Sequence, residues 1–333
     1  RLAIKDLWVD DNSLLFNTIN RNKESFTADF KNADDIAIIK KMIAKADVLI
    51  HNFRPEVMGK NGLDYKTVQQ INPKMIYAEI SGYGKTGPWK DKPGQDLLLQ
   101  SMAGLAYTTG NGSNGPVPFG IAVTDILCGA QLVQGILAAL IRRQKTGAGA
   151  LIEVSLMESL LDFQFELLTT YFTNKEQPQR SNVANGQPLL SAPYGIYATA
   201  NGYIALAMMD IHLLAKAIGC TGLNRFSKAQ VFSERDAIKT ILANYLRTQK
   251  TDIWLEQLQN EGLWAMEVLD WEGMTKSEAY QCLQMEQSVK TATGDIITTR
   301  CPIRINGKKI VTSQPAPQLG EHNQKIYQDL INS

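Results

Sequence analysis

The stretch VLIHNFRPEVMGKNGLDYKTVQQINPKMIYAEIS, Val48–Ser81, decides the fold class. It begins with an apolar triplet, Val48–Ile50, which predicts a buried strand. A polar link, a short helical segment at Asp64–Ile71 and a second strand at Met75–Ile80 follow. Strands that alternate with helices in this way are typical of a parallel sheet with helices on its faces. The sequence therefore predicts an α/β fold with a Rossmann-like large domain.

The segments on either side extend this pattern. Upstream, the alternation in Ser25–Phe30 predicts a short strand, and apolar residues at helical spacing predict a helix over Asp34–Ala46. Downstream, we expect a long apolar helix at Ile126–Arg142, a strand at Ile152–Val154 and another helix from Leu156 toward Tyr171.

A change of composition marks a second domain. The chain becomes polar and proline-bearing over Thr173–Pro188, and Ile196–Met208 reads as a hairpin that turns at Asn201–Gly202. Further helices are expected around Leu213, Ala237 and Trp254. We predict a large domain over residues 1–190, a smaller α+β domain over 191–300, and a tail, 301–333, that returns to the large domain.

The composition argues against several classes of protein. The 333 residues are 44% hydrophobic and 20% charged, as in an ordinary soluble protein, and a net charge of +1 gives no global attraction to nucleic acid or membranes. No uninterrupted apolar run reaches the roughly 18 residues of a membrane span, and we expect no signal peptide. The four cysteines form no CxxC pair and the three histidines lie far apart. We therefore expect reduced thiols, a cytoplasmic protein and no metal site.

One carboxylate stands out in the oily segment GIAVTDILCGAQL, Gly120–Leu132. Asp125 is its only charged residue, and no other charge occurs between Asp96 and Arg142. A buried carboxylate costs several kcal/mol unless something pairs with it. Either Asp125 caps a helix or it takes part in chemistry, and the residues alone leave both interpretations open.

Two motifs have plainer explanations than catalysis. Gly82, Gly84 and Gly87 have the GxGxxG spacing of a dinucleotide fingerprint, but neither a helical pattern nor the expected later acidic residue follows them. We interpret them as a glycine-rich active-site loop. In SLME, Ser155 and Glu158 have the spacing of a capping box, so a structural role is favoured over a nucleophilic one.

Several phrases together resemble the family III CoA-transferases, a superfamily that includes formyl-CoA transferase, carnitine CoA-transferase and alpha-methylacyl-CoA racemase. The phrases are NRNKES (Asn20–Ser25), ADVLIHNFRPEVMGKNGLDY (Ala46–Tyr65), NPKMIYAEISGYGKTGPWKDKPGQDLLLQSMAGL (Asn72–Leu105), GILAALIRRQKTGAGALIEVSL (Gly135–Leu156) and APQLGEHN (Ala316–Asn323). Their order and spacing carry the resemblance, which is dense from about Leu15 to Leu161. The family begins with a further βα unit that this sequence lacks.

The resemblance implies a nucleophile, a mechanism and an assembly. It places the family's aspartate nucleophile on Asp125, which would form an acyl-aspartyl anhydride and then an aspartyl-CoA thioester. It implies that acyl-CoA and a small carboxylic acid are substrates, with no permanently bound cofactor. It also implies a homodimer whose two subunits are threaded through one another as linked rings.

The resemblance further assigns residues around the nucleophile. The racemase branch has a catalytic histidine where this sequence has Gln95, and an amide cannot carry a proton at neutral pH, so racemisation is disfavoured. Gln95 is instead expected to hydrogen-bond an acyl or carboxylate group, or simply to face water. Asp96 matches an acidic position beside the nucleophile, where a structural hydrogen bond is an equal alternative. Candidate CoA contacts are Lys23, Asn52, Phe53, Arg54, Lys60, Asn61 and Asp96.

Two alternatives remain open at this stage. An acyl-CoA racemase or isomerase would catalyse exchange at the acyl α-carbon, and a CoA-binding protein without turnover would bind CoA and transfer nothing. The segment NGQP, Asn185–Pro188, resembles part of the glycine loop that closes over the active site of formyl-CoA transferase. The residues do not identify the donor and acceptor acids.

Overall fold

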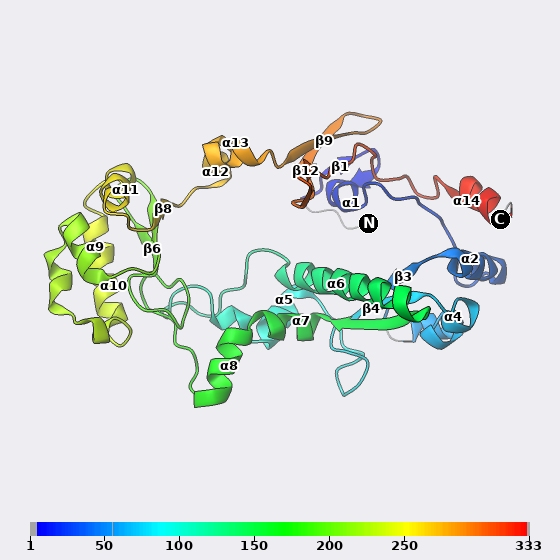
Figure 1. Cartoon of the computed structure of the whole chain (residues 1–333), viewed down its shortest axis with the longest axis horizontal. Helices are drawn as coiled ribbons and strands as arrows, with labels where there is room; N and C mark the ends of the chain where they lie inside the picture. Colours follow the sequence, from blue (N-terminus) through cyan, green and yellow to red (C-terminus); the bar gives the residue numbers. More distant parts are fainter. Residues whose placement is uncertain (1–4, 55, 332–333) are drawn as a thin grey trace. The chain divides into compact units, whose positions relative to one another are not determined.

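The structure is a computed structural model that describes residues 5–54 and 56–331. It divides into two compact units, one comprising Ala46–Val268 and the other both ends of the chain, up to Lys45 and from Leu269 onward (Figure 1). The boundaries expected from the sequence lay near residues 190 and 300, and the domain division stays a prediction.

A three-stranded parallel sheet forms the centre of the first unit. Its strands are β3 (Val48–His51), β4 (Ile76–Ser81) and β5 (Ala150–Ser155), in the order β3-β4-β5. Between β3 and β4 lie α3 (Val57–Lys60) and α4 (Tyr65–Ile71), and the side chain of Asp64 caps α4 by accepting from the amides of Lys66 and Thr67. The predicted β-α-β order and parallel sheet are confirmed.

The long helix α6 (Val123–Thr146) covers one face of this sheet (Figure 1). Its Leu132, Ile136 and Ala139 pack against Ile76 and Ala78 of β4 in a continuous apolar cluster. On the opposite face, Tyr77 is buried, and its hydroxyl donates to the carbonyl of Leu63 just before α4. β4 is therefore covered on both sides, which explains why residues 76–79 are all buried.

Further helices complete the large half of this unit. α5 (Asp96–Met102) and the 3₁₀ turn η1 (Leu105–Tyr107) precede α6, while α7 (Leu156–Phe163) and α8 (Phe165–Asn174) follow β5. The helix predicted from Leu156 toward Tyr171 is broken at Gln164. The backbone leaves the helical region there, and the buried amide of Gln164 donates to the carbonyls of Ala103 and Leu160. No helix begins at the GxGxxG glycines, in agreement with the plainer interpretation.

The second half of the same unit has its own core. An antiparallel sheet, β6 (Gly195–Ala198), β7 (Tyr203–Leu206) and β8 (Ala265–Glu267), packs with α9 (Ile211–Ile218), α10 (Arg235–Leu246) and α11 (Thr251–Asn260). The 3₁₀ turns η2 (Thr221–Arg225) and η3 (Lys228–Gln230) connect α9 to α10. β6 and β7 form the predicted hairpin, and the three predicted helices are present.

The second unit joins the two ends of the chain. Its N-terminal elements are β1 (Trp8–Val9), β2 (Asn12–Ser13), α1 (Leu14–Ile19) and α2 (Ala33–Lys45). Its C-terminal elements are α12 (Trp271–Lys276), α13 (Glu278–Leu283), β9 (Glu286–Lys290), β10 (Asp295–Thr299), β11 (Arg304–Ile305), β12 (Lys308–Lys309) and α14 (Asn323–Ile331).

The strand predicted at Ser25–Phe30 is not formed. This segment is extended, but its amides are satisfied by side chains of the C-terminal tail rather than by a neighbouring strand. Ser25 N donates to His322 Nδ1 at 3.2 Å, and Thr27 N donates to Asn323 Oδ1 at 2.9 Å. An alternating pattern indicates that a segment is extended, but the partner of its backbone hydrogen bonds is decided by the tertiary structure.

Among the described residues, α6 is the one helix long and apolar enough to cross a membrane by length and composition alone. Such a helix is also found in the core of soluble proteins. One side of α6, including Cys128 and Leu132, is buried against the protein. The opposite side carries exposed apolar residues.

Candidate active site

Asp125 lies in the wall of a cavity at the carboxyl edge of the parallel sheet. The cavity has a volume of about 760 Å³. Its walls come from the segment after β3, the end of β4 with its glycine loop, residues 90–94, the first turns of α6 and the start of α7. The lining residues are Asn52, Phe53, Arg54, Glu56, Ile80, Ser81, Gly82, Lys90, Asp91, Lys92, Pro93, Gly94, Asp125, Cys128 and Leu156. Ligands of open α/β sheets bind at this edge.

Asp96, not Asp125, caps α6. Oδ1 of Asp96 accepts from the amide of Thr124 at 2.8 Å, and its Oδ2 accepts from the Gln100 side chain at 2.6 Å. Among the described residues, no hydrogen-bond donor reaches the Asp125 carboxylate. Of the two interpretations that the sequence left open, helix capping therefore falls to a different aspartate, and the oxygens of Asp125 are available to a ligand.

The environment makes Asp125 more basic than an ordinary aspartate. Partial burial raises its pKa, and the negative charge of Asp96 raises it further. A higher pKa makes a carboxylate a better nucleophile once it is ionised, and it also makes it easier to protonate. As a whole residue Asp125 is nevertheless exposed, so its carboxylate is buried only in part, and less than the oily sequence led us to expect.

Two glycines bring the cationic loop to the sheet edge. A Cβ on Gly94 would lie 2.6 Å from the Cα of Gly82, and a Cβ on Gly82 would lie 2.9 Å from the Cα of Gly94. The loop that carries Lys90 and Lys92 can therefore cross the end of β4 only because both positions lack side chains. Gly82 also accepts a hydrogen bond from Met157 N at 3.1 Å, which ties the crossing to α7.

Three of the predicted CoA contacts lie together in this cavity. Asn52, Phe53 and Arg54 follow β3 directly and line the wall near Asp125. Lys60 and Asn61 do not line it: Lys60 pairs with Glu56 at 3.0 Å, and the Asn61 side chain donates to Val57 O at 2.7 Å.

The remaining predicted site residues lie elsewhere. Gln95 is exposed at the start of α5 and does not line the Asp125 cavity. Asp96 acts on Asp125 through its charge and through the helix cap. Lys23 belongs to the other unit, where its ammonium group donates to Ile19 O and Asn20 Oδ1.

Sequence reasoning missed Lys90 and Lys92. Both line the cavity, and the ammonium group of Lys92 lies 3.6 Å from the centre of the Trp89 ring. With Arg54 they place three cations around the pocket, a suitable arrangement for phosphate groups. The sequence does show two lysines in WKDKPG, between glycines, but nothing in it distinguishes lysines that line a cavity from ordinary surface lysines.

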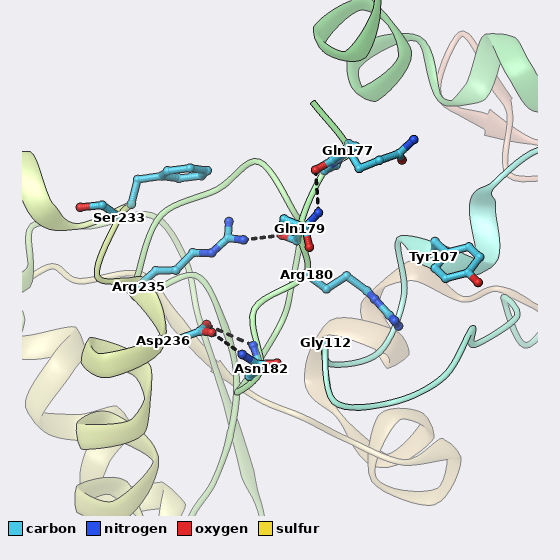
Figure 2. A pocket seen from close by; sticks show the side chains of 11 residues that line it. Tyr107, Gly112, Gln177, Gln179, Arg180, Asn182, Ser233, Arg235 and Asp236 are labelled. Atoms are coloured by element: carbon cyan, nitrogen blue, oxygen red, sulfur yellow. Dashed lines mark hydrogen bonds between the residues drawn. The ribbon is translucent and has the colours of Figure 1, made fainter. Parts of the chain in front are cut away.

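A larger cavity, of about 890 Å³, shares no residue with the Asp125 cavity. Figure 2 shows its wall, where Arg180 and Arg235 extend from the polar linker and from the start of α10. Arg180 donates to the carbonyls of Thr109, Asn114 and Gly115, and Arg235 donates to those of Gln179 and Pro188. Asp236 is likewise held by Ser181 and Asn182. These charges fasten the linker, so we place the chemistry at Asp125.

A mixed α/β fold with a ligand cavity at the carboxyl edge of a parallel sheet defines the general class as a ligand-binding α/β protein. The comparisons with known proteins make the class specific. The chain belongs to CoA-transferase family III, whose family model matches residues 3–323. It is therefore a CoA-transferase, an enzyme that takes CoA thioesters as substrates, and the resemblance drawn from the sequence is confirmed.

Curated relatives and a solved structure agree with this assignment. The chain is 30% identical to succinate–glutarate CoA-transferase of Agrobacterium fabrum, over 95% of this chain and 80% of that protein. It is 31% identical to acetyl-CoA:oxalate CoA-transferase of Acetobacter aceti, over 94% and 81%. Its fold matches the crystal structure of a CaiB/BaiF family protein from Brucella suis with a TM-score of 0.83 at 27% identity, covering 97% of this chain and 86% of that one.

Proposed function

We propose that this enzyme transfers CoA between carboxylic acids through covalent intermediates on Asp125. One observation carries the proposal: the Asp125 carboxylate lines a cavity beside three cations, and its oxygens accept no hydrogen bond among the described residues. Arg54, Lys90 and Lys92 would bind CoA phosphates, and the exposed Phe53 ring would pack on the adenine.

The first half of the reaction moves CoA onto the enzyme. An oxygen of Asp125 attacks the carbonyl carbon of the donor thioester, and the C–S bond breaks to release CoA thiolate and leave an anhydride. The thiolate then attacks the Asp125 carbonyl carbon of that anhydride. The donor acid leaves as a carboxylate, and CoA is held as an aspartyl thioester.

The second half runs the same steps with the acceptor. The acceptor carboxylate attacks the aspartyl thioester, thiolate departs, and a new anhydride forms. The thiolate attacks the acceptor's acyl carbon, which yields the new acyl-CoA and restores the Asp125 carboxylate. No water is consumed, so solvent must be kept from the anhydride.

The acceptor is proposed to be a small dicarboxylic acid. The two relatives at 30% and 31% identity carry succinate, glutarate or oxalate in their names. Donor and acceptor can be identified with a panel of acyl-CoAs and short mono- and dicarboxylic acids.

An oxygen-isotope experiment tests the covalent steps. In the proposed sequence, the bridging oxygen of the first anhydride comes from Asp125 and leaves with the donor acid, and the acceptor acid replaces it. Acceptor labelled with ¹⁸O in its carboxylate should therefore place one ¹⁸O in the peptide that contains Asp125 after turnover. An unlabelled Asp125 peptide after many turnovers would overturn the mechanism.

Substitution of Asp125 provides the complementary test. Asp125→Asn should abolish transfer while CoA binding is nearly unchanged, because the phosphate contacts remain. Asp162→Asn is the matched control, since Asp162 is an exposed aspartate on α7 whose carboxylate accepts from the Gln131 side chain. Deuterium exchange at the acyl α-carbon should be absent, and its presence would favour the racemase alternative.

We also propose that a second copy of the chain covers α6. Ile126, Val133, Leu137 and Ile141 are 53–61% exposed and form one row along the helix. This row begins next to Asp125, so a homodimer seated on it would bury apolar surface and exclude water from the nucleophile. Sedimentation should show a dimer that Leu137→Arg disrupts and that Thr169→Arg, at an exposed position on α8, leaves intact. A monomeric wild-type protein would contradict this assembly.

A further inference from the structure

Three ionisable residues lie side by side in the middle of the parallel sheet. His51 is paired in register with Glu79, and Glu79 is paired with Glu153, so the three occupy one row across β3, β4 and β5. All three point to the face opposite α6, because they alternate with residues that pack on that helix. The side chains of His51 and Glu79 are only 9% and 10% exposed.

A lysine from the glycine loop completes this row. Lys85 forms salt bridges with Glu79 and with Glu153, the latter at 3.3 Å. His51 Nε2 lies 3.4 Å from Glu79 Oε2 on the other side. We call His51, Glu79, Lys85 and Glu153 the charged row.

The hydrogen bonds of Tyr77 determine which ring nitrogen of His51 carries a proton. The Tyr77 hydroxyl donates its single proton to Leu63 O at 3.0 Å, so it accepts from His51 Nε2, which lies 3.0 Å away. The Nε2 proton therefore faces both Tyr77 and the Glu79 carboxylate. Burial by itself would raise the pKa of Glu79, but the contacts with His51 and Lys85 outweigh it and lower that pKa. Glu79 is accordingly ionised at neutral pH.

The charged row connects two segments that form the active-site cavity. On one side, the His51 ring stacks on Phe53, with ring centroids 6.0 Å apart and an angle of 22°. On the other side, Lys85 holds the loop Gly82–Gly87 against the sheet. A cavity of about 260 Å³, lined by parts of this row, lies behind Phe53, Arg54 and Ser81, which it shares with the Asp125 cavity.

We propose that the Glu79–Lys85 ion pair, oriented by His51, is a positioning device that holds the Asn52–Arg54 segment and the glycine loop at the separation needed to bind a CoA thioester. The pair touches neither the proposed nucleophile nor the reacting atoms, so its members are positioning residues. The identity of the bound substrate rests on the proposed function, whereas the connection between the two loops does not. Strand termini alone leave loops mobile. The ion pair anchors the glycine loop at Glu79, whose side chain is 10% exposed, while the 45% exposed Lys85 side chain is partly screened by water.

Kinetics of Lys85 variants test the proposal. Lys85→Met should raise KM for acyl-CoA by about tenfold and change kcat much less, because misplaced loops weaken binding while Asp125 is untouched. Lys85→Arg keeps the charge and should restore most of the affinity. Lys66→Met, which removes an exposed lysine on α4, is the matched control and should leave KM unchanged. An unchanged KM in Lys85→Met would overturn the proposal.

A double variant separates positioning from a general loss of stability. Lys85→Gln alone leaves the buried carboxylate of Glu79 without its main partner, whereas Glu79→Gln/Lys85→Gln replaces the ion pair by two neutral amides. If the residues act as a pair, the double variant should bind acyl-CoA no more weakly than Lys85→Gln. Strictly additive losses would show that they act independently and would contradict the proposal.

Hydrogen exchange gives a readout that does not depend on the reaction. In Lys85→Gln, amides in residues 51–54 and 82–87 should both exchange faster, while those of α9 and α10 keep wild-type protection. If both loops exchange faster but Asp125 gains no ¹⁸O in the isotope experiment, the positioning device is retained and the covalent mechanism is refuted. If Asp125 gains ¹⁸O but the loop amides exchange as in the wild type, the covalent mechanism is retained and the positioning device is refuted.

Discussion

Lys239 lies in the core beneath the linker, where a charged side chain is costly. It is 1% exposed, and its ammonium group donates to Ala184 O at 3.1 Å. Burial and, to a lesser extent, the nearby Arg235 guanidinium lower its pKa from 10.5 to about 8, against the opposing effect of Asp236. At about 1.4 kcal/mol per pKa unit, keeping Lys239 protonated in the folded state at neutral pH costs about 3 kcal/mol.

This cost gives stability a definite dependence on pH. Between the folded pKa of about 8 and the unfolded pKa of 10.5, the unfolded chain binds more protons at Lys239 than the folded protein does. The free energy of unfolding therefore rises with pH across this window, and the contribution is lost as the pH falls through 8. From about pH 7 to about pH 9.5 the gain from this one group is about 2 kcal/mol.

Denaturant unfolding at the two pH values measures this gain. Lys239→Met removes the titrating group, so the wild type should gain about 2 kcal/mol more than the variant between them. Tryptophan fluorescence is a suitable signal because Trp254 is buried in the same core. Lys216→Met, at an exposed position on α9, should behave as the wild type does. Equal pH dependence in wild type and Lys239→Met would refute the reasoning.

Two further predictions concern the active site. Asp96→Asn keeps the shape of the α6 cap but removes a negative charge, so the pKa of Asp125 should fall and the acidic limb of the kcat/KM profile should move to lower pH; an unshifted limb would show that Asp125 does not control it. Gly94→Ala places a methyl group against the Gly82 backbone and should cost about 1–3 kcal/mol of stability and lower activity. Gly59→Ala, where a Cβ meets nothing within 4 Å, is its control in thermal unfolding and turnover, and equal effects would contradict the crowding argument.

The central fold could be predicted because its signals are local. The apolar triplet before His51, the cap at Asp64 and the run at Met75–Ile80 each determine a short element from neighbouring residues. The break at Gln164 was missed because the partners of its side chain include Ala103, which lies 61 positions earlier. The start of α6 was placed at Ile126 rather than Val123 for a similar reason: its cap, Asp96, comes from another helix.

Only those site residues that match individual positions of the family pattern were predicted from the sequence. Asp125 and the segment Asn52–Arg54 do meet in one cavity, which their order along parallel strands made foreseeable. Lys90 and Lys92 join them because two glycine backbones cross within van der Waals contact, a proximity that no spacing in the sequence expresses.

By itself, the sequence determined the α/β class, the family and the isolation of one carboxylate in an apolar segment. These follow from periodicity and from motifs, which are properties of neighbouring residues. Only the tertiary structure decided which aspartate caps α6, which lysines face the cavity, and that His51, Glu79 and Glu153 share one row. Strand register and side-chain partners depend on contacts between residues far apart in the chain, so they exist only once it has folded.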